Sequence, residues 1–248
     1  MTYCVGMLVE DGLALIGDTR TNAGVDNIST YRKLHITEVP GERVLGVATA
    51  GNLSVTQTAL AMVAEGLKLP DCEVPETLLT ARTLFRAAQL IGQAVSQVRA
   101  SLAPQMQAEA VNTEATVLLG GQIGDGKLGL YLIYAQGNFI ECGVETPYLQ
   151  IGEFKYGKPI LDRALRHGTP LEEAVKLGLI SFDSTIRSNI AVGAPLDLLV
   201  VRRGVLKGFQ RRIEPDDTYF RDLGRHWSEA LAAAHRGMPA PPWLINGA

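Results

Sequence analysis

The amino-acid sequence predicts an α+β fold in which two antiparallel sheets stack face to face between outer layers of helices. Strand patterns occur in three runs, near the start, in the middle and near the end, and helical periodicity separates the runs. Strands that follow one another directly can pair as antiparallel neighbours, whereas a doubly wound parallel sheet needs strands that alternate with helices. At 248 residues the chain is long enough for one sizeable core, so we expect residues 1–248 to form a single domain.

The first fifty residues carry the first run of strands. Two apolar stretches flank the turn Glu10-Asp11-Gly12 and predict a hairpin. A polar loop, Thr19–Asn27, separates this hairpin from the next two stretches. The predicted strands are Tyr3–Val9, Leu13–Gly17, Ile28–Val39 and Arg43–Thr49.

Two helices are expected next. Asn52 or Ser54 could cap a helix that runs to about Leu67, because apolar residues recur there at helical spacing. Pro75 and Glu76 would open a longer helix that ends at Pro104. Its apolar stripe is typical of core packing.

The remaining chain returns to strands, then helices, then strands. The predicted strands are Ala115–Leu119, Leu128–Ala135, Asn138–Cys142, Leu196–Arg202 and Val205–Ile213, and the predicted helices are Pro159–His167, Leu171 to about Ile186, and about Asp217–Arg236. Because the residues from about 237 to 248 are rich in proline, we expect an irregular C-terminal tail.

Composition narrows the class of protein. The formal net charge of −3 argues against a nucleic-acid-binding protein, which is usually basic. No apolar run approaches the ~20 residues of a membrane span, and the start shows no secretory signal pattern. Three widely spaced cysteines (Cys4, Cys72 and Cys142) lack the CxxC spacing of zinc sites and fit a reducing cytoplasm. We therefore expect a cytoplasmic protein with no membrane and no nucleic-acid partner.

Thr2 is the most informative residue for function. It follows the initiator methionine directly and precedes a predicted strand. If Met1 is removed, Thr2 carries a hydroxyl nucleophile and a free α-amine, a potential general base whose unperturbed pKa is about 8. Such a nucleophile needs a nearby cation, a carboxylate that orients the cation, and backbone N–H groups that stabilise an oxyanion.

The first 51 residues contain all of these groups. Asp18 ends the second strand, Lys33 lies on the next one, and Ala50-Gly51 joins a strand end to a helix start, where N–H groups point outward. Taken separately, Asp18 is better explained as a turn residue and Lys33 as a solvated strand residue. Only the combination favours a catalytic site.

The combination resembles the proteasome β-subunits. The segments that carry the likeness are Thr2-Tyr3, Gly17–Gly24, Arg32-Lys33 and Gly46–Gly51, with further matches at Gln150–Glu153, Tyr156–Pro159 and Leu196–Val201. The likeness extends to the HslV-type bacterial peptidases and to the bacterial ancestral β-subunit (Anbu) group. It implies the four-layer αββα sandwich of N-terminal-nucleophile hydrolases and a peptidase that works without metal or organic cofactor.

The resemblance also implies residue roles. Thr2 would be the nucleophile, Lys33 would tune its amine, Asp18 would pair with Lys33, and the N–H of Ala50, beside Gly51, would bind the oxyanion. Arg20 and Asn22 would flank the substrate, and Ala48 would line the first specificity pocket. Supporting residues around the site would be Glu153, where relatives carry a serine, together with Asp183, Ser188 and Asn189, which match an HslV-type pattern.

Three functions fit these expectations. The first is a threonine peptidase that assembles as a ring or helical homo-oligomer and cleaves peptides or unfolded proteins. The second is an N-terminal-nucleophile amidase that acts on a small amide. The third is a catalytically silent assembly or scaffold subunit, in which Met1 stays in place. Since no GxxxxGK[ST] motif occurs, any energy-dependent feeding of substrates would need a separate ATP-dependent unfoldase.

Overall fold

The computed structural model describes residues 1–22, 28–108 and 112–245 of the chain. Two compact units make up the chain, Met1–Pro215 and Asp216–Ala248. The first unit contains two five-stranded antiparallel sheets, with strand orders β10-β1-β2-β11-β12 and β5-β6-β7-β8-β9, and a two-stranded ribbon, β3-β4.

The first sheet contains the chain start on an inner strand, β1, between β10 and β2. Its strands are β1 (Tyr3–Val9), β2 (Gly12–Asp18), β10 (Tyr148–Gly152), β11 (Leu196–Arg202) and β12 (Gly208–Ile213). Strands β1 and β2 are buried along nearly their whole length, as expected for strands covered on both faces. The register pairs Tyr3 with Gly152 and Leu196 with Asp18, so it brings three distant segments together beside Thr2.

The second sheet packs against the first through one face. Its strands are β5 (Leu34–Val39), β6 (Arg43–Gly51), β7 (Ala115–Ile123), β8 (Gly129–Ile133) and β9 (Phe139–Glu141). Successive side chains of a strand point to opposite faces. On β6, Val44 and Ala48 accordingly belong to the core between the sheets, whereas Leu45 and Val47 belong to the core under the helices.

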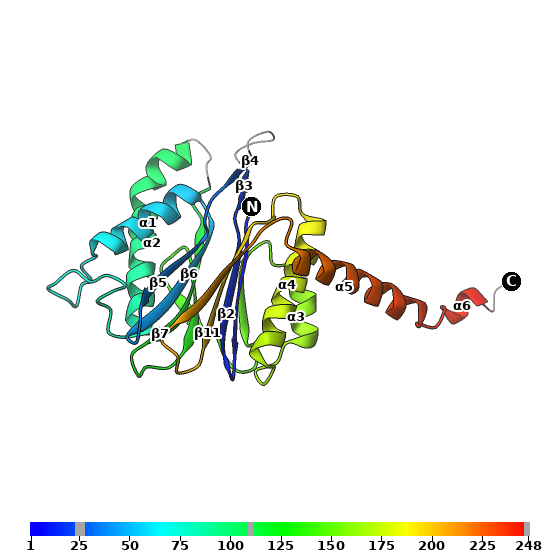
Figure 1. Cartoon of the computed structure of the whole chain (residues 1–248). Coiled ribbons are helices and arrows are strands. Elements are labelled where there is room, and N and C mark those ends of the chain that lie inside the picture. The colour runs from blue at the N-terminus through cyan, green and yellow to red at the C-terminus, as the bar shows by residue number, and fades with distance from the viewer. Residues whose placement is uncertain (23–27, 109–111, 246–248) are drawn as a thin grey trace. The chain divides into compact units, whose positions relative to one another are not determined.

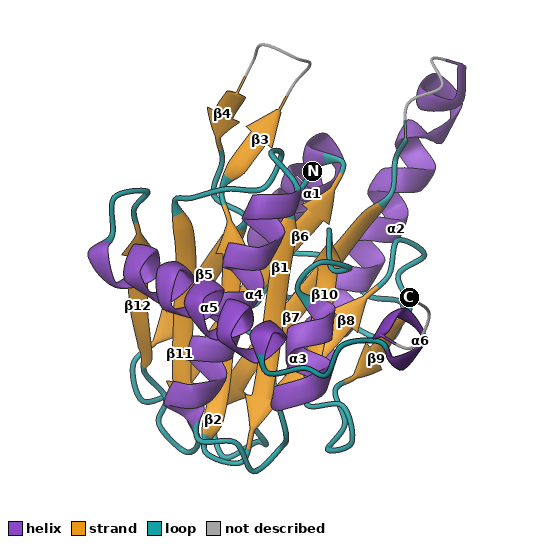
Figure 2. Ribbon diagram, turned by 90° about the vertical axis from the view of Figure 1, so that its right-hand side faces the viewer, coloured by secondary structure: helices purple, strands orange, loops and turns teal. Residues whose placement is uncertain are grey.

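Helices cover both outer faces. Helices α1 (Leu53–Glu65) and α2 (Leu84–Ala108) pack on the second sheet, and α3 (Lys158–Ala164) and α4 (Leu171–Ser188) lie on the first, where α4 contacts β1 and β2. Figure 1 shows the resulting order of layers, helices, sheet, sheet and helices, and Figure 2 shows α3 and α4 in front of the first sheet. The predicted αββα sandwich is therefore confirmed.

The region between β2 and β5 differs from the expectation. The predicted loop, Thr19–Asn27, begins with strand β3 (Arg20–Asn22), and the predicted strand Ile28–Val39 is divided into β4 (Ile28–Thr30) and β5. The strand breaks because β4 pairs back on β3 and the Tyr31 N–H donates to the Thr19 carbonyl at 2.8 Å. Residues 23–27 lie outside the described part of the chain.

Helix α2 begins nine residues later than predicted and continues through Pro104. The preceding segment is held in a non-helical form by paired backbone hydrogen bonds between Leu67 and Glu76 and by ion pairs from Arg86 to Glu76 and Asp71. Strand β10, a short segment that pairs with the distant β1, was not predicted.

The second unit contains α5 (Thr218–Arg236) and α6 (Pro242–Ile245). Helix α5 agrees with the helix predicted at about Asp217–Arg236 and begins one residue later, because the Asp217 carboxylate caps it by accepting the Phe220 N–H at 2.9 Å. The tail expected to be irregular contains α6, which starts with Pro242, and proline is well tolerated at the first position of a helix. Across the described residues, no helix combines the length and the hydrophobicity needed to span a bilayer.

Candidate active site

Thr2 lies immediately before β1 and is nearly buried, with 8% of its surface exposed. Its carbonyl accepts the Glu153 N–H at 2.7 Å, which extends the β1–β10 pairing by one step. Gly152 has a φ of +79°, and a Cβ there would collide with the Thr2 carbonyl. Glycine at position 152 is therefore needed for β10 to approach Thr2 so closely.

Asp18 and Lys33 form a buried ion pair beside Thr2. Lys33 Nζ lies 2.8 Å from Asp18 Oδ1, and only 5% and 0% of these side chains are exposed. The same Nζ donates to the Arg20 carbonyl at 2.6 Å and to the Met1 carbonyl at 3.2 Å. Since the Met1 carbonyl belongs to the peptide bond that joins Met1 to Thr2, the ammonium group is held directly at the start of Thr2.

Burial acts on the charge of Asp18. It raises the pKa of the Asp18 carboxyl above its ordinary range, while the Lys33 ammonium and the Tyr3 N–H, which donates to Oδ1 at 3.1 Å, act in the opposite direction. Among the described residues, none donates a hydrogen bond to Asp18 Oδ2. A buried carboxylate of this kind is costly unless its partner stays in place, so the pair is strongly coupled.

The N–H of Ala50 faces the neighbouring strand β7. Asn52 donates its N–H to the Glu114 carbonyl at 2.8 Å, and the register pairs Ala50 with Thr116. Because N–H groups alternate sides along a strand, the N–H of Ala50 points the same way as that of Asn52. This direction is away from Lys33, which corrects the predicted oxyanion donor.

The N–H that faces the site is that of Gly51. On the β5 side of β6, Thr49 donates its N–H to the Lys33 carbonyl at 3.0 Å, and Gly51 points to this side beyond the start of β5. Gly51 has a φ of +102°, and a Cβ would collide with the Glu114 carbonyl. Glycine is thus required at the position that presents this N–H.

A cavity of about 340 Å³ borders Thr2. It is lined by Met1, Thr2, Thr21, Lys33, Thr49, Ala50, Gly51, Leu53 and Thr56. Ala48, predicted to line such a pocket, is instead fully buried between the sheets, because even-numbered β6 side chains face the first sheet. Strand alternation would have identified Thr49, and the helical register of α1 would have added Leu53 and Thr56.

A second hollow of about 540 Å³ shares Ala50 and Gly51 with this cavity and continues to Gly152 and Phe154. Open space therefore flanks Gly51 on two sides. A substrate could extend through both spaces while its reacting carbonyl lies at Gly51.

Glu153 and Asn189 lie near the chain start. Glu153 Oε2 accepts the Asn189 side-chain N–H at 2.9 Å and lies 3.7 Å from Lys155 Nζ. The same Asn189 amide contacts the Met1 sulfur at 3.9 Å. The structure thus brings these two predicted residues together beside Met1.

Asp183 and Ser188 are not brought to the site. Asp183 Oδ2 pairs with Arg187 Nε at 2.9 Å within α4, and Ser188 is exposed at the end of that helix. Neither side chain lines the two hollows beside Gly51.

Arg20, expected to flank the substrate, contacts the protein backbone in the structure. The Arg20 guanidinium donates to the Ile190 carbonyl at 2.9 Å and does not line either hollow. Asn22 ends β3, and its side chain lies outside the described part of the structure.

Cys4 is unsuited to act as a second nucleophile. Its side chain is fully buried on β1, and its Sγ lies 3.9 Å from the Thr49 carbonyl. Burial raises the pKa of the Cys4 thiol strongly, so the reactive thiolate is disfavoured.

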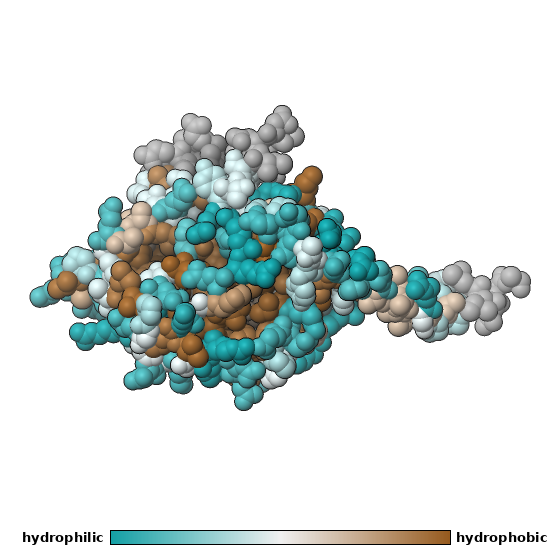
Figure 3. Space-filling view, in the orientation of Figure 1, coloured by the Kyte–Doolittle hydropathy of each residue, from teal (hydrophilic) through white to brown (hydrophobic). Residues whose placement is uncertain are grey.

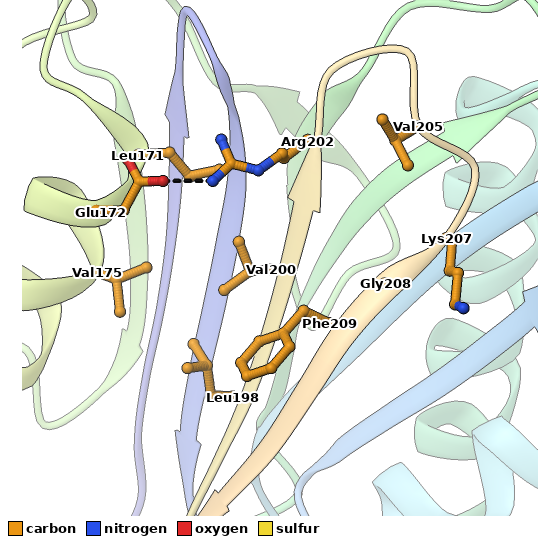
Figure 4. Close-up of a pocket in the computed structure, with 10 residues that line it drawn as sticks. All are labelled: Leu171, Glu172, Val175, Leu198, Val200, Arg202, Val205, Lys207, Gly208 and Phe209. Carbon is orange, nitrogen blue, oxygen red and sulfur yellow. Dashed lines mark hydrogen bonds and ion pairs between the residues drawn. The ribbon is translucent and has the colours of Figure 1, made fainter.

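An apolar hollow of about 580 Å³ lies elsewhere, on the outer face of β11 and β12. Figure 4 shows Leu198, Val200 and Phe209 on its sheet side and an ion pair from Arg202 to Glu172 at its edge. It shares no lining residue with the cavity at Thr2. Figure 3 shows that apolar side chains also reach the surface in patches on the face turned to the viewer.

In the part of the chain that the structure describes, no three His, Cys, Asp or Glu side chains gather as metal ligands would.

Two stacked sheets between helix layers, with a threonine at the head of an inner strand, define the proteasome β-type fold of N-terminal-nucleophile hydrolases. Comparison with solved structures identifies the branch of this class. The chain is 44% identical to an Anbu (Gly-1) mutant from Hyphomicrobium sp. strain MC1, with a TM-score of 0.88 over 97% of this chain and 99% of that one.

Two further solved structures of Anbu proteins are similar to the chain over nearly its whole length. Anbu (ancestral β-subunit) from Yersinia bercovieri is 43% identical, with a TM-score of 0.85 over 96% of this chain and 98% of that one. The helical assembly of the Anbu complex from Pseudomonas aeruginosa is 43% identical, with a TM-score of 0.88 over 98% and 100%. The chain belongs to the Anbu family. No protein-family model and no curated protein matches the sequence.

Proposed function

We propose that the chain is a threonine peptidase that becomes active when Met1 is removed. The observation that carries the proposal is the position of Lys33, whose Nζ joins Asp18 to the carbonyl that precedes the Thr2 nitrogen. A buried cation at this point would keep a free Thr2 amine largely neutral, as a general base must be. The adjoining cavity gives a peptide side chain a place to bind.

The chemistry uses the residues around Thr2. Thr2 Oγ attacks the carbonyl carbon of a peptide bond, and its proton passes to the Thr2 amine. The Gly51 N–H stabilises the oxyanion, the amine then gives the proton to the leaving nitrogen, and the C–N bond breaks. Water hydrolyses the remaining ester, with the same amine as base, and restores Thr2.

The proposed setting is a homo-oligomer in the cytoplasm, formed by one peptidase domain over residues 1–248. A related structure is described as a helical assembly, which supports self-assembly of this chain. The three cysteines are free, as in a reducing compartment. Substrates would be peptides or unfolded proteins, and folded substrates would need a separate ATP-dependent unfoldase.

The decisive experiment joins intact-mass measurement with kinetics and covalent labelling. A chain lacking one methionine should hydrolyse fluorogenic peptides and react with a peptide epoxyketone, and Thr2→Ala should lose about 10³-fold or more of the rate and all labelling. Asp125→Asn, in an exposed turn, serves as a control variant with unchanged rate. Unchanged hydrolysis in Thr2→Ala would refute the proposed nucleophile.

Two other outcomes are informative. Met1 is 64% exposed in the structure. While Met1 is retained, the Thr2 nitrogen is part of a peptide bond and cannot act as a base. A mass that includes Met1 would therefore favour the silent assembly subunit. Turnover of small amides with no cleavage of any peptide would favour the amidase.

A further inference from the structure

The loop between α4 and β11 (residues 189–195, here the 189–195 loop) packs against β3. The Arg20 guanidinium donates to the Ile190 carbonyl at 2.9 Å. Gly193 lies so close that a Cβ at this position would collide with the guanidinium carbon and nitrogens of Arg20. The loop backbone and the Arg20 side chain are therefore in close contact.

The same loop reaches the buried carboxylate of the site. The Gly193 backbone N–H lies close enough to Asp18 to favour its ionised form, although it makes no direct hydrogen bond to Oδ2. One residue away from Asp18, the Thr19 hydroxyl donates to the Pro195 carbonyl at 2.7 Å. Gly193 and Pro195 of the loop are thus held next to Asp18 and Thr19, where β2 ends.

Arg20 is also joined to the site through its backbone. Its carbonyl accepts a hydrogen bond from Lys33 Nζ at 2.6 Å, independently of its side chain. A change of the Arg20 side chain therefore leaves the Lys33 contact in place and removes only the contact to the 189–195 loop.

We propose that Arg20 is a positioning residue, whose guanidinium holds the 189–195 loop so that the Gly193 N–H faces Asp18, and so stabilises the ionised carboxylate that retains Lys33. Its effect on catalysis rests on the proposed peptidase function. Its effect on Asp18 does not, so the two can be tested separately.

Three variants separate positioning from substrate binding. Arg20→Ala removes the guanidinium, and Arg20→Lys retains the charge without the planar group. Gly193→Ala keeps Arg20 but places a methyl group where the guanidinium lies, so it disturbs the same contact from the loop. Because the end of the Arg20 side chain is flexible, we expect Gly193→Ala to fold. Arg187→Ala, at an exposed arginine in α4 near the loop, is the matched control.

The kinetic readout is the division between kcat and KM. A misplaced carboxylate lowers kcat, and we expect a loss of about tenfold in Arg20→Ala and Gly193→Ala, with KM changed by less than about twofold. Arg20→Lys should recover only part of the rate, and Arg187→Ala should match the parent. A rise in KM with kcat unchanged would assign Arg20 to substrate binding and overturn the proposal.

The second readout needs no activity. Carbon-13 NMR titration of the aspartate carboxyls, with Asp18 assigned from Asp18→Asn, should show a higher Asp18 pKa in Arg20→Ala and Gly193→Ala than in the parent. An unchanged titration in both variants would overturn the proposal even if hydrolysis depends on Thr2. If hydrolysis proves independent of Thr2, the proposed function fails, while the titration still decides the role of Arg20.

Discussion

The Asp18–Lys33 pair concentrates the electrostatics of the site in one buried contact. Lys33 forms three hydrogen bonds, to Asp18 and to the carbonyls of Met1 and Arg20, so its three N–H groups are all used. Asp18 has one oxygen that accepts two donors and a second with no direct hydrogen bond among the described residues. The arrangement stabilises the ammonium group more completely than the carboxylate.

This asymmetry predicts a pH dependence of stability. Burial raises the folded-state pKa of Asp18 above the unfolded value of about 3.9, so with rising pH the unfolded chain loses this proton first. The contribution of Asp18 to the free energy of unfolding is thus greatest below about pH 3.9 and falls as pH rises through the folded-state pKa. Urea unfolding of the parent and of Asp18→Asn between pH 3 and 8 measures the difference.

The parent-minus-variant difference in unfolding free energy should fall with pH. Asp125→Asn, in an exposed turn, should show no such slope. A difference that rises with pH would mean that Lys33 outweighs burial and that the Asp18 pKa is lowered.

Gly51 allows a second prediction for a single residue. In Gly51→Ala, the added methyl group meets the Glu114 carbonyl at a φ of +102°, and neither backbone can move without breaking the β6–β7 pairing. We expect a destabilisation of about 1–3 kcal/mol and a loss of kcat of about 10²-fold or more, because the N–H is displaced. Chemical denaturation and peptide kinetics measure the two effects.

Gly41→Ala is the matched control. Gly41 also has a positive φ, +76°, but a Cβ there meets no atom within 4 Å. It should lose about 1 kcal/mol and retain full activity. Equal rates in Gly51→Ala and Gly41→Ala would show that the Gly51 N–H has no catalytic part.

At the scale of elements, the junction of β6 and α1 shapes the cavity at Thr2. Thr49 is the β6 side chain that faces the helix layer at this point, and Leu53 and Thr56 come from the first turn of α1. Asn52 caps the helix by accepting the Val55 N–H at 3.1 Å, which fixes the angle between strand and helix. A single strand-to-helix turn thus positions both Gly51 and the pocket.

We predict that Thr49→Leu narrows the cavity and shifts cleavage toward small residues at the scissile position. One or two added methylenes change discrimination by about 10-fold or more in a hydrophobic pocket. A peptide library with varied residues before the cleaved bond measures the shift. Ala48→Val, which points between the sheets, should lower stability by about 1–3 kcal/mol without changing the preference. A changed preference in Ala48→Val with an unchanged preference in Thr49→Leu would show that Ala48, and not Thr49, lines the specificity pocket.

The sequence predicts elements with local signals well and pairings between distant segments poorly. The β1–β2 hairpin, the Asn52 cap and the start of α5 depend on neighbouring residues and follow from pattern. Strand β10 and the break before β5 depend on partners far along the chain, so no local signal specifies them.

The site shows the same division. Asp18, Lys33 and the turn at Gly51 were found because their residue types suit the chemistry of an N-terminal threonine. The N–H role expected of Ala50 falls to Gly51, and the pocket role expected of Ala48 falls to Thr49. Each prediction was wrong by one residue, and a one-residue shift on a strand reverses the direction of both N–H and side chain. The contact of Arg20 with Gly193 joins segments more than 170 residues apart and is visible only in the fold.

At the scale of the whole molecule, the proposed homo-oligomer predicts that thermal stability depends on protein concentration. If the chain forms a homo-oligomer, folding and association are linked, and a 100-fold rise in concentration adds about 2.7 kcal/mol to the apparent stability. For a chain of this size the Tm should rise by about 5–10 °C between 1 and 100 µM. Thermal unfolding at one fixed scan rate, paired with sedimentation velocity at each concentration, tests this. The Tm and the assembled fraction should increase together, whereas a constant Tm with a monomer mass of 26.7 kDa throughout would exclude assembly in this range.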